Sequence, residues 1–156
     1  MILKLIKQFG GLIQAAVLFL GVMMRILVVG SRNWVNYNEL MRNLTLAIED
    51  AAAEADPDDN KIIFVHTGSQ GAENMTTEYV GKVEKFMRQK GYSVKEELFR
   101  KRYSGNNVDR ITSDYDMITS GIDSALVFIK DSCRRSEYCA RILKEFDIPT
   151  RIIKEK

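Results

Sequence analysis

Three short runs of apolar residues, each followed at once by a polar loop, set the strongest limit on what this chain can fold into. The first run, residues 26–29, is rich in β-branched side chains and is too short for a free-standing helix. It predicts a strand buried on both faces, as in the middle of a parallel sheet. Residues 62–65 and 125–129 repeat the pattern, and we expect further strands at 92–99 and 150–153.

Between these runs, apolar residues recur at spacings of three and four, as on the buried face of an amphipathic helix. The spacing predicts a helix over about 37–55 and another from about 73 to 90, with Phe86 on its buried face. Two more helices are expected, one before and one after the 125–129 strand. Strands that alternate with helices through short loops indicate a parallel sheet covered on both faces. We therefore expect an α/β fold over residues 25–156, a doubly wound and mainly parallel Rossmann-like sheet.

Residues 1–24 do not fit this pattern. Lys4 and Lys7 precede the stretch 9–24, in which Gln14 is the only polar side chain. Sixteen residues make about 24 Å of helix, which is shorter than the hydrocarbon core of a bilayer, roughly 30 Å. Three interpretations of this hydrophobic helical extension stay open: an appended segment or upstream start, an anchor at the cytoplasmic face of a membrane, and a helix that packs into the domain.

Composition limits the partners and cofactors. The formal net charge of +2 gives no large basic surplus, so we do not expect nucleic acid as a partner. Cys133 and Cys139, with His66 far away in sequence, are too few ligands for zinc, and we expect no metal and no cofactor. Two free thiols are typical of the reducing cytoplasm, where we place the protein.

In a doubly wound sheet, ligands bind beyond the carboxyl ends of the strands, where the strand order reverses. After the first strand, Gly30, Ser31 and Arg32 supply a sharp turn, a hydroxyl and a guanidinium that suit a phosphate. An ordinary turn with a solvated arginine is the alternative. Trp34 either stacks on a base or covers the edge of the core.

The loop after the second strand holds two glycines. Gly68 and Gly71 allow backbone N–H groups to face one point at a helix start, although a simple tight turn explains them equally well. His66, at the end of the strand, is either a hydrogen-bonded structural residue or a general base. The chain has no Gly-Lys-Ser or Gly-Lys-Thr, so a P-loop nucleotidase is not supported.

Three segments together resemble the SLOG superfamily of Rossmann-like domains, and in particular its small bacterial and phage proteins. They are Gly-Ser-Arg-Asn-Trp at 30–34, His-Thr-Gly-Ser-Gln-Gly-Ala-Glu at 66–73 and Ile-Pro-Thr-Arg-Ile-Ile at 148–153. The superfamily includes Lonely Guy phosphoribohydrolases, single-strand-DNA-binding DprA proteins and sensors of nucleotide-derived signals. The resemblance implies a nucleotide-derived small molecule as ligand and a homodimer or higher homo-oligomer. The ligand contacts that it adds are Thr67, Ser69, Glu73, Ser132 and Ser136.

The chain departs from the family pattern after the strand at 125–129. Phosphoribohydrolases carry Gly-Gly-x-Gly-Thr-x-Glu there, whereas this chain has Asp-Ser-Cys-Arg-Arg-Ser-Glu at 131–137. Ser136 stands in for the threonine hydroxyl and Glu137 for the acid. Without glycines, however, the backbone cannot approach a phosphate closely. The nearest match to the family's Arg-Asn-x-x-Met motif keeps only the arginine, Arg110.

Two main functions stay open, and we favour the first. It is a sensor or binding protein for a nucleotide or NAD-derived ligand, held in a crevice at the carboxyl ends of the strands. The second is an N-glycosidic phosphoribohydrolase acting on a nucleoside monophosphate. There, Arg110 would orient the phosphate or ribose, and Glu137 would stabilise an oxocarbenium ion or activate water. A DprA-like single-stranded DNA binder is a more distant third.

Overall fold

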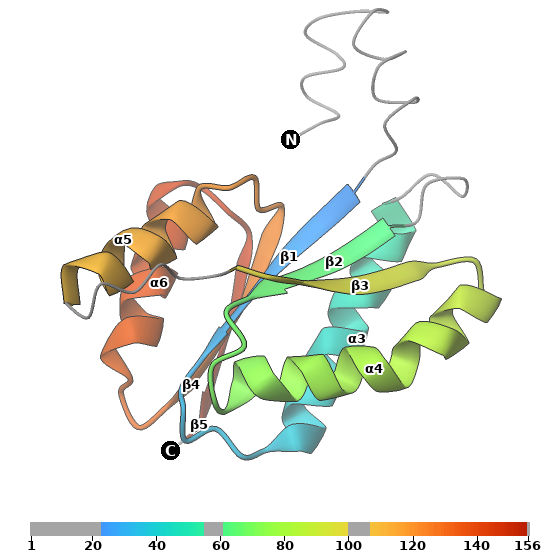
Figure 1. The fold of residues 1–156 in the computed structure, drawn as a ribbon, viewed down its shortest axis with the longest axis horizontal. Helices are drawn as coiled ribbons and strands as arrows, with labels where there is room; N and C mark the ends of the chain where they lie inside the picture. The colour runs from blue at the N-terminus through green and yellow to red at the C-terminus, as the bar shows by residue number, and fades with distance from the viewer. Residues whose placement is uncertain (1–22, 55–60, 100–106, 156) are drawn as a thin grey trace, which may run out of the picture.

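The computed structural model describes residues 23–54, 61–99 and 107–155, and for 107–112 only the backbone. Five strands form one sheet in the order β3-β2-β1-β4-β5, and every neighbouring pair is parallel. The hydrophobic extension expected at 1–24 lies outside the described residues, except for its last two. The strands are β1 (Met23–Gly30), β2 (Lys61–His66), β3 (Ser93–Leu98), β4 (Ser124–Lys130) and β5 (Thr150–Glu155). The helices are α3 (Tyr37–Glu54), α4 (Ala72–Gln89), α5 (Asn107–Ile118) and α6 (Arg134–Glu145) (Figure 1).

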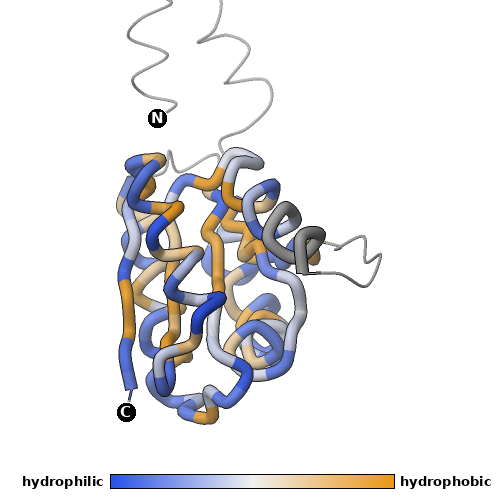
Figure 2. Tube along the Cα trace, turned by 90° about the vertical axis from the view of Figure 1, so that its left-hand side faces the viewer, coloured by the Kyte–Doolittle hydropathy of each residue, from blue (hydrophilic) through white to orange (hydrophobic). Residues whose placement is uncertain are grey.

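The central strand β1 contributes to two cores, because its successive side chains point to opposite faces of the sheet. Ile26 and Val28 pack with residues of α3 and α4 on one face, whereas Leu27 and Val29 pack with residues of α5 and α6 on the other. Figure 2 shows the hydrophobic strands running through the middle of the molecule between helices of mixed hydropathy. The predicted α/β, doubly wound fold is confirmed, with a sheet that is parallel throughout.

The strand order reverses between β1 and β4. From β1 the chain continues through α3 to β2 on one side, and from β4 it continues through α6 to β5 on the other. Beyond these two neighbouring strands the chain therefore diverges to opposite faces of the sheet, to α3 on one face and to α6 on the other. This separation is the topological feature that places ligands in doubly wound folds.

Phe86 on α4 does not lie where the helical spacing predicts. Its side chain is 55% exposed, and the ammonium of Lys90 lies 4.6 Å from its ring centroid. The fully buried positions of α4 include Thr76 and Val80, and Phe86 lies on the helix well to one side of that row. The ring is therefore at the rim of the buried face, with Lys90 covering it.

Candidate functional site at the carboxyl edge of the sheet

The loop after β1 is fastened to β4. The Ser31 hydroxyl is buried and accepts the Lys130 N–H, with 2.9 Å between N and Oγ. The Ser31 N–H donates to the Phe128 carbonyl, also at 2.9 Å. Arg32 follows as an exposed side chain with no hydrogen bond or ion pair among the described residues. Ser31 thus links the end of β1 to β4 by hydrogen bonds, and the side chain of Arg32 is exposed and accessible to a ligand.

Trp34 covers the core and has no ring face open to a ligand in this structure. The side chain is 1% exposed, and its ring meets that of Phe128 edge to face, with 5.2 Å between centroids. Its Nε1–H donates to the Asn36 carbonyl at 3.0 Å. Of the two interpretations of Trp34, this geometry matches the cover over the core and leaves no surface for stacking on a base.

Gly30 and Gly71 allow the start of α4 to pack tightly against the end of β1. A Cβ added at Gly30 would lie 2.3 Å from the Cβ of Ala72. Gly71 has φ of +92°, and a Cβ there would lie 2.3 Å from the Ser31 carbonyl oxygen. Distances this short exclude any side chain, so both glycines serve the close approach of two loops within the protein.

His66 is fully buried and is hydrogen-bonded through both ring nitrogens. The Gly68 N–H donates to Nδ1 at 3.0 Å, and Nε2 lies 3.0 Å from Glu96 Oε2. Because Nδ1 accepts, the neutral ring carries its proton on Nε2 and donates it to Glu96. Burial lowers the pKa of His66, and the nearby charges of Glu73 and Glu96 offset only part of that effect. This is the geometry of a structural histidine that fixes the turn at Gly68, where φ is +74°.

The loop after β2 already surrounds an anion of the protein's own. The carboxylate of Glu73 is fully buried, and its Oε1 accepts the Thr67 N–H at 3.0 Å and the Thr67 hydroxyl at 2.8 Å. The Ser69 hydroxyl lies 2.7 Å from that of Thr67 and extends the chain of hydrogen bonds. The Thr67 N–H and hydroxyl therefore both donate to Glu73. The Glu73 carboxylate occupies the turn in which a phosphate was expected.

Arg135 joins three helices at this edge through two buried carboxylates. Its Nη1 donates to Glu73 Oε2 at 2.7 Å. Its Nε and Nη2 donate to the two carboxylate oxygens of Asp114, each at 3.0 Å. Burial alone would lower the pKa of Arg135, but the hydrogen bonds and charges of Asp114 and Glu73 outweigh burial and raise it above its ordinary value. The guanidinium is thus held by the protein and is not offered to a ligand.

Sequence reasoning did not single out Arg135 or Asp114. It treated Arg135 only as a residue in place of a family glycine. The sequence offers one sign of this contact: Arg135 lies in the first turn of a helix that follows a buried strand, and Glu73 lies in the first turn of the helix after another buried strand. The partner on α5 lies 21 positions earlier in the chain, and no local pattern identifies it.

The loop between β4 and α6 is sharply turned. Asp131 and Ser132 both have positive φ, +52° and +55°, and Asn33 from the β1 loop donates to Asp131 at 3.1 Å. The half-buried thiol of Cys133 accepts a hydrogen bond from the buried Ser136 hydroxyl at 3.4 Å. Burial raises the pKa of Cys133, but hydrogen bonds from Ser136, and from the Ser31 hydroxyl, outweigh it and leave that pKa below its usual value.

Of the two residues expected to carry glycosidase chemistry, Glu137 has a described side chain and Arg110 does not. Glu137 is exposed in the first turn of α6, and its side chain makes no hydrogen bond or ion pair with another described residue. Arg110 lies in α5, where its side chain is outside the description. Of the two hydroxyls expected to contact a ligand, that of Ser136 donates to Cys133, and Ser132 is exposed.

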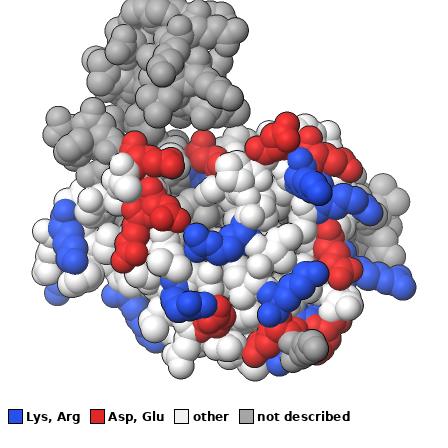
Figure 3. All heavy atoms as spheres, turned by 180° about the vertical axis from the view of Figure 1, so that it is seen from behind, with Lys and Arg blue, Asp and Glu red and all other residues white. Residues whose placement is uncertain are grey.

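Basic and acidic side chains are interspersed over the face that Figure 3 draws. No group of three or more His, Cys, Asp or Glu side chains within 23–54, 61–99 and 107–155 is placed to hold a metal ion. None of the described helices combines the length and the apolar character needed to cross a bilayer.

Comparison of the chain with protein-family models, with curated proteins and with solved structures found no match.

Proposed function

We propose that this protein is a sensor or binding protein for a phosphate-bearing, nucleotide-derived small molecule, held where β1 and β4 end. The observation that carries the proposal is the pair of exposed arginines at this point, Arg32 and Arg134. Ser31 accepts the Lys130 N–H and Asn33 donates to Asp131, so the loops after β1 and β4, which carry these two arginines, lie side by side.

The two arginines differ from Arg135 in being available. Neither Arg32 nor Arg134 has an ion pair among the described residues, whereas Arg135 is held by two carboxylates. A guanidinium donates bidentate, charge-assisted hydrogen bonds to phosphate, which makes a free pair of them a suitable anion site. We therefore keep the phosphate contact expected in the loop after β1, and we propose the loop after β4 as its second part in place of the turn at Gly68 and Gly71.

Binding is favoured over N-glycosidic cleavage because neither nearby acid is poised for catalysis. A general acid or base must be held within hydrogen-bond reach of the reacting atoms. Glu73 is held, but its two carboxylate oxygens already accept hydrogen bonds from Thr67 and Arg135. Glu137 has no described partner that would fix its position. The geometry therefore supports recognition of a ligand more directly than chemistry on it.

A thermal-shift panel tests the proposal with AMP, ADP-ribose and cyclic dinucleotides, and with inorganic phosphate as a minimal probe. A ligand at 100 times its dissociation constant should add about 2.7 kcal/mol to the free energy of unfolding. Arg32→Ala should weaken binding by about 1.5–3 kcal/mol, as loss of a charge-assisted hydrogen bond does. Arg88→Ala, an exposed arginine in the last turn of α4, is the matched control and should bind normally. Equal affinity in Arg32→Ala and wild type would contradict the assignment.

A further inference from the structure

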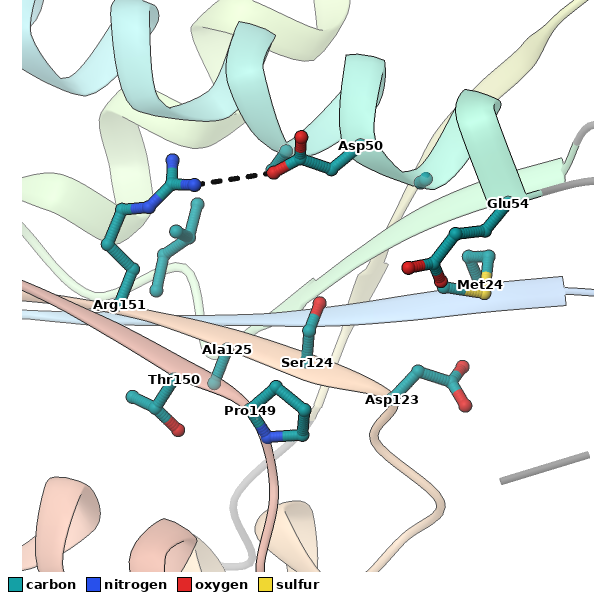
Figure 4. Close-up of a pocket in the computed structure, with 12 residues that line it drawn as sticks. Met24, Asp50, Glu54, Asp123, Ser124, Ala125, Pro149, Thr150 and Arg151 are labelled. Carbon is teal, nitrogen blue, oxygen red and sulfur yellow. Dashed lines mark hydrogen bonds and ion pairs between the residues drawn. The ribbon is translucent and has the colours of Figure 1, made fainter. Parts of the chain in front are cut away.

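A groove lies at the opposite, amino edge of the sheet. Its volume is about 340 Å³, and it runs between the last turns of α3 and the first residues of β1, β4 and β5 (Figure 4). The apolar part of its lining includes Met24, Ala51, Ala125, Leu126 and Pro149. Small-molecule sites in proteins have volumes of roughly 300–1,000 Å³ and mostly apolar walls. The groove therefore has the size and lining for one small ligand.

The charged groups of the groove are mostly acidic. Asp50, Glu54 and Asp123 line it together with a single cation, Arg151. Arg151 pairs with Asp50 at 3.3 Å, and Figure 4 shows this pair at one end of the groove, away from Glu54 and Asp123. Both partners of the pair are exposed, so the contact contributes little to stability. Pairing Arg151 with Asp50 leaves two carboxylates at the other end.

Those two carboxylates lack a cationic partner among the described residues. Glu54 makes no hydrogen bond or ion pair there. Asp123 uses one oxygen, Oδ2, to accept the Arg25 N–H at 2.8 Å, which leaves the other without a described partner. Two carboxylates without a described cationic partner, beside an apolar lining, are complementary to a molecule with one positive charge and an apolar body.

We propose that the groove binds a small organic ammonium ion, with its charged group at Glu54 and Asp123 and its apolar body against Ala51 and Leu126. The site is separate from the proposed nucleotide site, because the two lie at opposite edges of the sheet. It does not depend on the function proposed for the carboxyl edge. An anionic ligand is disfavoured because it would face the uncompensated carboxylates.

Methyl NMR of the full chain tests this proposal with 2-phenylethylammonium as the probe. Saturable shifts should be confined to methyl groups that line the groove, which are those of Met24, Ala47, Ala51, Ala125, Leu126 and Thr150. The neutral analogue 2-phenylethanol, which has the same apolar body, should bind more weakly. Glu54→Gln should raise the dissociation constant about two- to fivefold, the range expected from a partly exposed ion pair.

Glu49→Gln is the matched control, because Glu49 is an exposed acid of the same helix outside the groove. It should leave the dissociation constant unchanged. Three results would overturn the proposal: shifts that do not saturate or that lie outside the groove, binding of the alcohol as tight as that of the ammonium ion, or an unchanged dissociation constant in Glu54→Gln.

Discussion

The guanidinium of Arg135 lies 2.7 Å from the buried carboxylate of Glu73, with Nη1 donating to Oε2. This contact joins the first turn of α6 to the first turn of α4 across the carboxyl edge of the sheet. Asp114 on α5 accepts from the same guanidinium. One side chain therefore sets the relative positions of three helices around the candidate site.

Removal of Arg135 should be among the most destabilising substitutions in the chain. Arg135→Met would leave Glu73 and Asp114, 0% and 2% exposed, without this charge partner. Breaking a buried pair by removing one partner typically costs about 3–5 kcal/mol. Urea unfolding measures the change, and Arg134→Met at the adjacent exposed position should cost less than about 0.5 kcal/mol. A loss below 1 kcal/mol in Arg135→Met would show that the bridge is not structural.

Two glycines near and within α4 should respond to alanine in opposite directions. Gly71→Ala places a Cβ 2.3 Å from a backbone oxygen at a φ of +92°, so it should destabilise the protein and disturb the turn after β1. Gly81→Ala meets no atom within 4 Å in an exposed part of the helix, and should stabilise the protein by about 0.5–1 kcal/mol. Thermal unfolding of both variants checks the contrast. A harmless Gly71→Ala would mean that the two loops are not packed as described.

Folding stability should fall in mild acid because of His66. Burial lowers its folded-state pKa, so below the unfolded value, about 6.5, the unfolded chain binds a proton that the folded protein does not. The contribution of His66 is complete above pH 6.5 and is lost as the pH falls from there toward the lowered pKa. This one group changes the free energy of unfolding by at most about 1.4 kcal/mol per pH unit. The measurement is the free energy of unfolding of wild type and of His66→Gln between pH 5 and 8. If the two proteins gave parallel curves of this free energy against pH, the assignment of the pH dependence to His66 would be refuted.

Purified protein should release no free base from nucleoside monophosphates. The reason is the lack of a held and reactive carboxylate: Glu73 is neutralised by Arg135, and Glu137 is exposed without a described partner. Chromatographic assay of base release over a panel of monophosphates is the measurement. Turnover that falls at least ~10²-fold in Glu137→Gln, the low end for a general acid or base, would instead make the protein a hydrolase.

The positions of the buried strands could be predicted from the sequence, because each is a short apolar run that ends in polar turn residues. The run at 26–29 lies in the buried carboxyl half of β1, and the run at 125–129 is β4 without its first and last residues. Such local signals suffice because a parallel sheet covered on both faces requires uniformly apolar strands.

The site was less predictable, because its contacts join residues far apart in sequence. Arg135 bonds to Glu73 across 62 positions, and no motif at either residue specifies the other. Trp34 shows the same limit: an exposed and a buried tryptophan are alike in sequence, and only the contact with Phe128 decides between them. The glycine motifs were ambiguous too, because a glycine is needed for close approach to a phosphate or to backbone. At Gly71 the close neighbour is the protein's own backbone.

A ligand site where β1 and β4 end is tested most directly by protection of Cys133 from alkylation. This half-buried thiol adjoins Ser31 and Ser136, and its lowered pKa increases the reactive thiolate near neutral pH. Cys139 is fully buried and serves as an internal reference for opening of the whole domain.

Mass spectrometry after timed exposure to iodoacetamide follows both thiols in the same sample. A nucleotide that raises thermal stability should slow modification of Cys133 in proportion to its occupancy, and Arg32→Ala should remove that protection at the same concentration. Alkylation of Cys133 at an unchanged rate under saturating, stabilising ligand would contradict the account, since the ligand would then bind elsewhere.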